Sequence, residues 1–232
     1  MKAVILAGGI GERLRPLTET IPKVMMNVQG RTLIEHVFDI LKRAGITEVY
    51  LSIGYMADKI QAYYGDGKKF GMKIHYLVEK ERLGTGGWMR LIERPGEDIF
   101  VMNGDNLYDL DLREVYRSHR KMKADATIVL TKVGDVRHYG IVELKDDRIM
   151  RFVEKPTPEE APSDYANSGY YVFSPSVFDF MPADKDAFML EKDLFPAIAQ
   201  KGLLCGFRSS AQWFDTGTHE QLRKVNDEWL KR

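Results

Sequence analysis

The sequence predicts an α/β fold with a doubly wound, mostly parallel but mixed sheet and a smaller, mixed β portion. Two observations lead to this prediction. In the first half of the chain, short apolar runs alternate with helix-like segments, an order typical of parallel strands joined by right-handed crossovers. In the second half, several β-like runs follow one another with fewer helices between them. Helices should therefore cover both faces of the sheet in the first half.

The first half contains four strand candidates and one clear amphipathic helix. Strands rich in Val, Ile, Leu, Phe and Tyr are expected at 2–6, 48–53, 73–78 and 98–102. Segment 31–44 repeats apolar residues with the period of a helix, and Gly45 follows it as a C-terminal cap. We expect this half to be Rossmann-like. The apolar face of the helix consists of Leu33, Ile34, Val37, Phe38, Leu41 and Ala44.

The second half begins with a predicted hairpin. Asp146 and Asp147 form a turn signal between β-like runs, and Pro156, Pro158 and Pro162 later mark a polar loop. The β-like runs lie at 125–132, 140–144 and 148–153, followed by a strand at 168–173, helices at 175–181 and 189–200, a strand at 203–208 and a closing helix from about 218.

Composition limits the classes of protein that the chain can belong to. Its 232 residues suffice for one sizeable core, so we expect a single domain over 1–232. Lys plus Arg and Asp plus Glu each number 34, which makes nucleic acid an unexpected partner. The lone Cys205 cannot form an internal disulfide and is interpreted as a packing residue. With no signal-peptide pattern and no long apolar stretch, we expect a cytoplasmic protein without a membrane partner.

A glycine-rich turn follows the first strand and favours phosphate binding. Gly8, Gly9 and Gly11 end the apolar run at the edge where parallel sheets bind ligands. Glycine permits positive φ and a close approach of the ligand to the main chain, so that turned amides can surround phosphate oxygens. Arg13 and Lys23 add positive charge.

Two commoner phosphate loops are excluded by the residues around this turn. A Walker loop needs Gly-Lys followed by Ser or Thr, and a dinucleotide fingerprint needs a glycine where this sequence has Leu14. An ordinary strand-to-helix turn with surface Arg and Lys remains the alternative interpretation.

Two aspartates, Asp105 and Asp215, are candidate ligands of a magnesium ion. Asp105 ends the apolar strand that reads Val-Met-Asn-Gly-Asp, on the edge that carries the glycine turn, where a carboxylate can hold a hard cation against phosphates. Asp215 has a similar context in Trp-Phe-Asp-Thr-Gly-Thr. Each could instead cap a turn or helix, but Thr218 with Gln221 forms a more natural cap for the last helix.

The N-terminal segment also resembles the signature of a known family. The matching residues are Leu6-Ala7-Gly8-Gly9, Gly11, Arg13-Leu14, Pro16-Leu17-Thr18 and Pro22-Lys23. The chain is similar in this segment to the sugar-1-phosphate nucleotidylyltransferases, or nucleotide-sugar pyrophosphorylases, and later motifs follow in the family's order as far as Asp215. The resemblance implies that residues 1–120 mainly bind a nucleoside triphosphate with Mg²⁺ and that residues 121–232 mainly bind a sugar 1-phosphate.

The resemblance also implies individual roles. Arg13 and Lys23 are the expected catalytic cations, and Asp105 and Asp215 the expected Mg²⁺ ligands. The expected nucleotide-binding residues are Leu6, Ala7, Gly8, Gly9, Gly11, Glu79, Gly84 and Thr85. The expected sugar-phosphate-binding residues are Asn103, Gly104, Tyr139, Gly140, Glu154, Lys155 and Asn167.

Glu154 and Lys155 can both serve the sugar-phosphate site only under one structural condition. Glu154 could hydrogen-bond sugar hydroxyls and Lys155 could hold the anomeric phosphate as a point charge. Consecutive strand residues face opposite ways, so both can serve one site only if the strand ends or bulges at Pro156. Apart from the resemblance, this pair has the character of a solvated strand edge.

Substrate identity stays open at the level of sequence. The short length and the Leu-Gly-Thr-Gly-Gly segment resemble guanylyl- and uridylyl-transferring members, with a preference for GTP and mannose or heptose 1-phosphate. UTP or dTTP with glucose or amino-sugar 1-phosphate is the alternative, and a cytidylyl- or molybdopterin-type transferase a more distant one. A noncatalytic nucleotide-sugar sensor is a further possibility. The expected assembly is a monomer or a small homo-oligomer.

Overall fold

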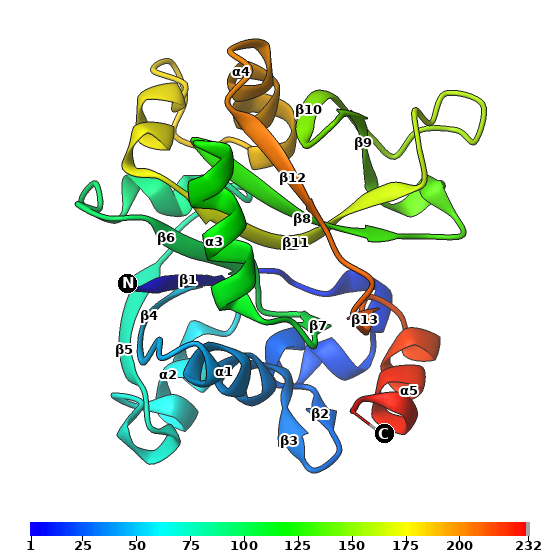
Figure 1. The fold of residues 1–232 in the computed structure, drawn as a ribbon. Helices are drawn as coiled ribbons and strands as arrows, with labels where there is room; N and C mark the ends of the chain where they lie inside the picture. The colour runs from blue at the N-terminus through cyan, green and yellow to red at the C-terminus, as the bar shows by residue number, and fades with distance from the viewer. Residues whose placement is uncertain (231–232) are drawn as a thin grey trace. The chain divides into compact units, whose positions relative to one another are not determined.

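The structure, a computed structural model, describes residues 1–230 and consists of two compact units (Figure 1). Unit 1 comprises residues 1–81, 102–112 and the segment from 211 onward, and unit 2 comprises 82–101 and 113–210. Each unit is therefore built from segments far apart in the sequence. Strand β6 (Ile99–Asn103) carries the chain from unit 2 into unit 1.

Unit 1 contains the parallel strands expected of the first half. Strand β1 (Ala3–Leu6) pairs with β4 (Glu48–Ile53), which pairs with β5 (Lys73–Val78), and both pairings are parallel. The predicted strands at 2–6, 48–53 and 73–78 are thus confirmed in position and direction. The side chains of β1 from Ala3 to Ile5 are fully buried, which explains its continuous apolar run.

Helices α1 (Leu33–Arg43) and α2 (Ala57–Tyr64) connect these strands. The predicted helix at 31–44 begins two residues later, because residues 31 and 32 form a short strand. Thr32 caps α1 by accepting a hydrogen bond from the Glu35 amide at 3.3 Å. At the other end of the chain, α5 (His219–Glu228) is capped by Thr218, which accepts from the Gln221 amide at 3.2 Å.

Two small antiparallel pairs in unit 1 were not expected from the sequence. Strands β2 (Asn27–Val28) and β3 (Arg31–Thr32) form a hairpin. Strand β7 (Asn106–Tyr108) pairs with β13 (Trp213–Asp215), from the far end of the chain. Strands of two or three residues lack the length over which alternating hydrophobicity can be recognised.

Unit 2 is built on five strands that close on themselves. Their order is β11 (Tyr165–Phe173), β8 (Ala126–Lys132), β12 (Leu204–Arg208), β10 (Arg148–Glu154) and β9 (Gly140–Lys145), and β9 pairs again with β11. Only the β8–β12 pair among them is parallel. A mixed β portion was expected for the second half of the chain, and this unit agrees with that, but the closing of its strands on themselves was not foreseen. Its pairings are mostly antiparallel because its strands are joined by hairpins and antiparallel returns rather than by crossover helices.

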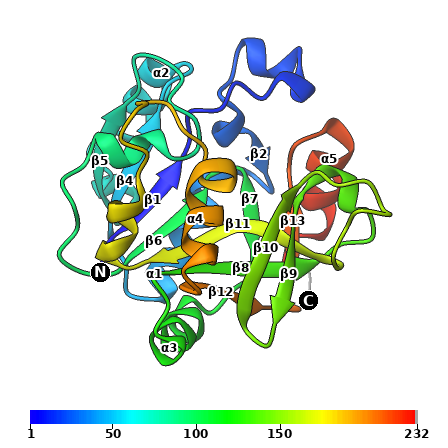
Figure 2. The same cartoon turned by 90° about the horizontal axis from the view of Figure 1, so that it is seen from above.

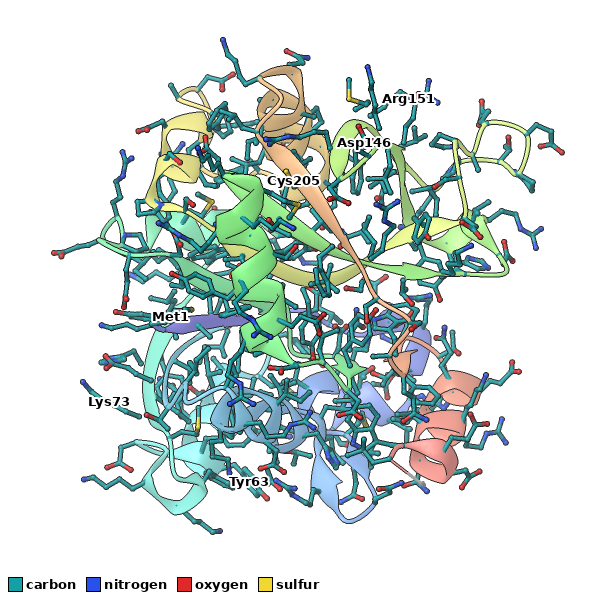
Figure 3. All side chains as sticks on the ribbon, in the orientation of Figure 1. Met1, Tyr63, Lys73, Asp146, Arg151 and Cys205 are labelled. Atoms are coloured by element: carbon teal, nitrogen blue, oxygen red, sulfur yellow. The ribbon has the colours of Figure 1, made fainter. Side chains whose placement is uncertain are left out.

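The hairpin predicted around Asp146 and Asp147 is confirmed. Strands β9 and β10 flank this turn and pair antiparallel, with Arg148 opposite Lys145. Figure 3 labels Asp146 at the turn, Arg151 on β10 and Cys205 on β12. Asp146 has a φ of 55°, a conformation that Asp tolerates better than most residues. Cys205 is fully buried, which agrees with its interpretation as a packing residue.

The helices of unit 2 are less regular than expected. Helix α3 (Leu112–Met122) precedes β8. Segment 175–180 is a 3₁₀-helix, and the predicted helix at 189–200 consists of a π-helix (Leu190–Leu194) followed by α4 (Phe195–Gln200). Helix α4 lies against β10 and β12 (Figure 2). Pro175 and Pro196 stand near the starts of these helices, where a missing amide is tolerated.

The cores of the two units are mainly apolar, with a few buried polar side chains such as His36 and His119. Phe38 and Leu14 are among the fully buried side chains of unit 1, and Tyr170, Phe173 and Phe195 among those of unit 2. No helix within residues 1–230 combines the length and the apolar character that a membrane span requires.

Candidate active site

Where the chain leaves β1 and enters the glycine turn, the first backbone groups are hydrogen-bonded within the protein. The Ala7 amide donates to the Ser52 carbonyl at 2.7 Å, and the Leu6 carbonyl accepts from the Gly104 amide at 2.9 Å. Beyond them, the amides of Gly8, Gly9 and Gly11 donate to no other group of residues 1–230. Unpaired amides in a glycine turn can bind an anion, as the sequence predicts.

Gly11 brings Lys23 against this turn. It has a φ of 70°, and a Cβ at this position would lie 2.9 Å from Thr18 Cγ2 and 3.1 Å from Lys23 Cβ. The Thr18 hydroxyl also donates to the Gly11 carbonyl at 3.0 Å. A glycine is therefore required both by the backbone conformation and by the close approach of these side chains.

Lys23 forms an ion pair with Asp105. The distance between Lys23 Nζ and Asp105 Oδ2 is 2.5 Å, and only 9% of the lysine side chain is exposed. Asp105 follows Gly104, where a Cβ would lie 3.0 Å from Ile5 Cγ2 and 3.1 Å from the Leu6 carbonyl oxygen. Gly104 thus allows the end of β6 to pass close to the end of β1, and Asn103 is the last residue of β6 before it.

The β7–β13 ribbon brings Asp215 next to Asp105. Asp215 pairs with Asn106, the residue directly after Asp105. The Thr216 hydroxyl donates to the Asp105 carbonyl at 2.7 Å, which ties the two strand ends together. Two carboxylates that are 110 positions apart in the sequence (residues 105 and 215) therefore lie in one region of unit 1.

The environment of Asp215 opposes its negative charge. Burial raises the pKa of the Asp215 carboxyl, the nearby Asp105 carboxylate raises it further, and the cations of Lys23 and Arg13 lower it in part. Gln221 Nε2 donates to Asp215 Oδ2 at 3.3 Å. A bound cation would therefore stabilise the negative charge of Asp215.

Arg13 lies beside this pair of carboxylates. A Cβ at Gly217 would be 2.5 Å from Arg13 Nη2 and 3.1 Å from Asp215 Oδ1, so the guanidinium and the carboxylate border the same glycine. Within residues 1–230, no ion pair joins Arg13 to a carboxylate. Arg13 is exposed, and its donors can therefore bind an anionic ligand.

The residues present fit a magnesium ion. Mg²⁺ commonly takes one or two protein carboxylates and completes its shell with water and substrate phosphates. Asp105 and Asp215 supply two carboxylates near the glycine turn, while no group of three or more His, Cys, Asp or Glu in the described part of the chain could form an all-protein site. Such a site would need the phosphates of a ligand.

Glu79 stands on the other side of the glycine turn, directly after β5. Its Oε1 accepts a hydrogen bond from the Ser52 hydroxyl at 2.5 Å. The same oxygen would lie 3.6 Å from a Cβ on Gly8. A carboxylate is thus held beside the turn, within unit 1, by a side chain from the neighbouring strand β4.

The Leu-Gly-Thr-Gly-Gly segment (residues 83–87) belongs to unit 2, and the hydroxyl of Thr85 is hydrogen-bonded within the protein. Gly84 has a φ of 75°, and a short 3₁₀-helix (Gly87–Arg90) follows in place of a longer helix. The Thr85 hydroxyl donates to Glu191 Oε2 at 2.5 Å and accepts from the Leu190 amide at 2.9 Å. Thr85 therefore holds its own loop in place.

Glu154 and Lys155 meet the condition stated for them. Strand β10 ends at Glu154, and Lys155 has a φ of 50°, so the chain leaves the strand between the two residues. The Lys155 amide donates to the Tyr139 carbonyl at 3.0 Å, and Gly140 pairs with Glu154. A Cβ at Gly140 would lie 2.9 Å from Glu154 Oε2, so this glycine makes room for the carboxylate.

Asn167 is engaged within its own strand. Its Nδ2 donates to the Tyr171 hydroxyl at 2.9 Å, and its Oδ1 accepts from the Gly169 amide at 2.9 Å. These bonds stabilise an irregularity in the pairing of β11 with β8 between Asn167 and Tyr171. In this structure Asn167 shapes the strand.

Four residues at these places were not singled out from the sequence. They are Ser52 beside Glu79, Thr216 and Gln221 beside the aspartates, and Glu191 beside Thr85. Thr216 lies inside the Trp-Phe-Asp-Thr-Gly-Thr motif, which was a usable signal. Gln221 was recognised only as the capping partner of Thr218, although Asp215 is six residues away. Ser52 and Glu191 are single polar residues whose partners are distant in sequence, and no pattern marks them.

A family model and curated relatives match nearly the whole chain. The model described as "Nucleotidyl transferase" matches residues 2–232. A mannose-1-phosphate guanylyltransferase of Mycobacterium tuberculosis is 37% identical over 95% of this chain and 62% of its own length. A D-glycero-alpha-D-manno-heptose 1-phosphate guanylyltransferase of Aneurinibacillus thermoaerophilus is 33% identical over 98% of both chains. The chain spans 61 to 68% of the length of several other curated relatives that it matches.

Solved structures share the fold. A putative glucose-1-phosphate thymidylyltransferase from Bacillus anthracis, crystallised with sucrose, superposes with a TM-score of 0.88 at 29% identity and covers 98% of this chain and 94% of its own. HddC from Yersinia pseudotuberculosis, complexed with GMP-PN, superposes with a TM-score of 0.81 at 29% identity over 97% of this chain and 98% of its own. The mixed α/β fold is therefore one that nucleotidyltransferases use.

Proposed function

The chain belongs to the nucleotidyl transferase family, which confirms the family predicted from its motifs, and on that premise we propose that it joins a nucleotidyl group to a sugar 1-phosphate. An oxygen of the sugar phosphate attacks the α-phosphorus of a nucleoside triphosphate and forms a new P–O bond. The bond between the α-phosphorus and the bridging oxygen breaks, and pyrophosphate leaves with its electron pair. No covalent bond to the protein is needed.

The observation that carries this proposal is the convergence in unit 1 of a glycine turn, two cations and two carboxylates. Both reactants are anions, so the protein must align them and offset their charge. Alignment of two bound reactants can lower a barrier by about 7 to 11 kcal/mol in favourable cases. The free amides of Gly8, Gly9 and Gly11 bind the triphosphate, and Arg13 lies where it can stabilise charge on the departing pyrophosphate.

Lys23 acts through its position between the turn and Asp105. Its side chain is largely buried and fixed by the 2.5 Å ion pair, so its charge is oriented before substrate binds. We assign it to the phosphates that donor and acceptor share. Asp105 and Asp215 hold Mg²⁺, which supplies charge neutralisation at the phosphates when it is bound. The mutual repulsion of these two carboxylates supports this assignment.

The sugar phosphate is assigned to unit 2. Glu154 and Lys155 stand where β10 ends, with the main chain of Tyr139 and Gly140 beside them. Glu154 can accept hydrogen bonds from sugar hydroxyls, and the exposed Lys155 can pair with the anomeric phosphate. Asn103 and Asn167 are proposed contacts of lesser weight, since the Asn167 amide already bonds within β11.

Glu79 favours GTP as the nucleotide. An ionised carboxylate only accepts hydrogen bonds, and the base-pairing edge of guanine presents two adjacent donors, the N1–H and the 2-amino group. Uracil and thymine present one donor flanked by two carbonyl oxygens, which a carboxylate repels. We therefore propose GTP with mannose or heptose 1-phosphate, in line with the guanylyltransferase relatives. UTP or dTTP with glucose or amino-sugar 1-phosphate is the alternative.

Pyrophosphate release across a panel of substrates tests the proposal. The purified protein with Mg²⁺ is given GTP, UTP, dTTP, ATP or CTP, each with mannose, heptose, glucose or glucosamine 1-phosphate. Release that needs both a triphosphate and a sugar phosphate, and is fastest with GTP, is the expected result. Triphosphate binding without release in any combination would contradict the proposal and support a noncatalytic nucleotide sensor.

Replacing Glu79 tests how the base is selected. Glu79→Gln replaces one acceptor oxygen by a donor, so kcat/KM with GTP should fall about 10- to 100-fold, while kcat/KM with UTP rises relative to it. Glu81→Gln, two residues along the chain and exposed, is the matched control. An unchanged GTP to UTP ratio in Glu79→Gln would show that this carboxylate does not contact the base.

A further inference from the structure

A single hydroxyl connects two distant segments of unit 2. Thr85 Oγ1 donates to Glu191 Oε2 at 2.5 Å and accepts from the Leu190 amide at 2.9 Å. Both hydrogen-bonding directions of this hydroxyl are therefore used, and the segments that it joins are more than 100 residues apart in the sequence (|i−j| of 106 and 105).

The main chain reinforces this connection. The Gly86 amide donates to the Phe188 carbonyl and the Phe188 amide donates to the Leu83 carbonyl, both at 2.9 Å. A Cβ at Gly84 or Gly86 would collide with Phe188. The 83–87 loop, which contains the expected nucleotide-binding residues Gly84 and Thr85, thus lies directly against residues 188–191.

Glu191 lies in an uncommon type of helix and near other charged side chains. It lies in the first turn of the π-helix Leu190–Leu194, and π-helical turns occur often at functional sites. This turn packs against β10. Burial raises the pKa of the Glu191 carboxyl, the Thr85 hydrogen bond lowers it, and the charges of Glu154 and Lys155 raise and lower it respectively. Glu191 is thus near the end of β10 as well as the loop.

We propose that Glu191 is a positioning residue that fixes the 83–87 loop, through the Thr85 hydroxyl, in the conformation that binds the nucleotide. This inference rests on the proposed function. Glu191 orients Thr85, and Thr85 with the Phe188 main chain holds Gly84 and Gly86 of the loop. Because Gly84 and Gly86 lose more conformational freedom on ordering than other residues do, a loop that contains them gains most from an external anchor.

A catalytic or purely structural role for Glu191 predicts different behaviour. A carboxylate that touched the reacting atoms would be needed for turnover whatever the substrate concentration. A purely structural residue would affect the stability of unit 2 and the KM values of both substrates alike. A residue that orders the nucleotide loop should act on the KM of the triphosphate in particular.

Kinetics of four single variants and one double variant distinguish these roles. Glu191→Ala and Thr85→Val should each raise the KM for GTP about 10- to 100-fold, the usual effect of losing a hydrogen bond to a charged group, and leave the KM for mannose 1-phosphate nearly unchanged. Glu191→Gln and Thr85→Ser keep an acceptor and a hydroxyl and should stay close to wild type. The double variant Glu191→Ala/Thr85→Val should be no worse than Thr85→Val alone, because the valine already removes the hydrogen bond to Glu191 that Glu191→Ala removes.

Lys192→Ala, at the next and exposed position of the same turn, is the matched control and should leave both KM values unchanged. Additive effects of the two substitutions, or a fall in kcat at saturating GTP with no change in KM, would overturn the proposal.

Amide hydrogen exchange tests the same anchor without catalysis. In the ligand-free protein, the Gly86 and Leu190 amides should exchange at least about ten times faster in Glu191→Ala and Thr85→Val than in wild type and Lys192→Ala. If wild type releases no pyrophosphate but this difference is found, the proposed function fails and the anchor stands. If exchange is unchanged, the anchor is refuted even though the enzyme is active.

Discussion

Arg13 is the residue on which the proposed transfer depends most directly. It is exposed, borders Gly217 beside Asp215, and makes no ion pair with a carboxylate within residues 1–230. Arg13→Ala should lower kcat about 10²- to 10³-fold, the usual effect of removing one charge-stabilising donor, with little change in the free energy of unfolding. Steady-state kinetics and thermal denaturation measure the two quantities.

Arg15→Ala is the matched control for that variant. Arg15 is also exposed and only two residues away. The hydrogen bonds that the structure gives it involve its backbone, since its amide donates to the Glu12 carbonyl and its carbonyl accepts from His219. It should keep near-normal turnover. An Arg13→Ala enzyme that turned over as fast as Arg15→Ala would remove Arg13 from the mechanism.

Asp215 should lower the free energy of unfolding of the metal-free protein at neutral pH. Burial and the Asp105 carboxylate raise the pKa of Asp215, so the folded state disfavours its charged form. The neutral form is present below the ordinary pKa of 3.8, where the folded protein has its full stability. That stability is lost as the pH rises through the folded pKa. At pH 7, Asp215→Asn should therefore melt at a higher temperature than wild type in EDTA. Thermal melts at pH 7 and at pH 3.5 measure the difference, which should shrink at the lower pH.

The same variant tests the proposed Mg²⁺ site. Wild type should gain melting temperature when Mg²⁺ is added together with GTP, and Asp215→Asn should gain much less, because one ligand is lost. Equal gains in the two proteins would mean that Asp215 does not hold the ion.

The segment between β13 and α5 borders Arg13, the proposed catalytic cation, so closely that its shape constrains the guanidinium. A Cβ at Gly217 would lie 2.5 Å from Arg13 Nη2, at the movable end of that side chain, and Gly217 does not need positive φ. Gly217→Ala should fold normally but displace the guanidinium, and such a displacement can lower kcat by up to about 10²-fold. Kinetics and denaturation of the variant check both parts.

Gly96→Ala provides the comparison for this substitution. A Cβ at Gly96 meets nothing within 4 Å, so this variant should behave as wild type in both measurements. Equal activity of the Gly217 and Gly96 variants would indicate that Arg13 adapts without loss.

Strands of four or more residues were recognisable from the sequence, and strands of two or three residues were not. The parallel strands β1, β4 and β5 each have a run of apolar residues long enough to show a pattern. The three-residue strands β7 and β13 have none, and their pairing is stabilised only by contacts between distant segments. The π-helix at Leu190–Leu194 lies inside the predicted helix at 189–200, and only its π-type hydrogen bonding was not foreseen, because a single turn is too short to show a period of its own.

At the scale of the whole molecule, a buried histidine should make stability depend on pH. His36 Nε2 bonds the Val28 carbonyl at 2.9 Å, and its Nδ1 accepts from Trp229 Nε1 at 3.2 Å, which holds the neutral ring between the N- and C-terminal segments of unit 1. Burial lowers the pKa of His36 below 6.5. Stability is therefore full above pH 6.5 and is lost as pH falls through the folded pKa, by at most about 1.4 kcal/mol per pH unit for one proton.

His36→Gln should reduce this dependence. Between pH 7 and pH 5 the free energy of unfolding of the variant, measured by urea denaturation, should fall less than that of wild type. Burial also lowers the pKa of His119 in unit 2, so part of the dependence should persist. His138→Gln changes an exposed histidine and should keep the wild-type slope. Identical slopes in all three proteins would exclude His36 as the group responsible.

The candidate site was foreseen to different degrees in its different parts. Arg13, Lys23 and the glycine turn are close together in the sequence, so their proximity follows from local structure alone. That Asp105 and Asp215 lie together was expected only through the family resemblance. The partners Ser52 and Glu191 could not be foreseen, because a single polar residue has the same local pattern whether it faces solvent or a distant side chain.

The amino-acid sequence by itself determined the family, the parallel strands of the first half and the chemical types gathered at the glycine turn, because these properties reside in contiguous residues and short-range spacing. Only the tertiary structure decided that five strands of unit 2 close on themselves, that Thr85 and Asn167 are bonded within the protein, and that Lys23 pairs with Asp105. These features depend on pairings between segments far apart in the chain. Such pairings form through burial and hydrogen bonding in three dimensions, which local sequence patterns do not encode.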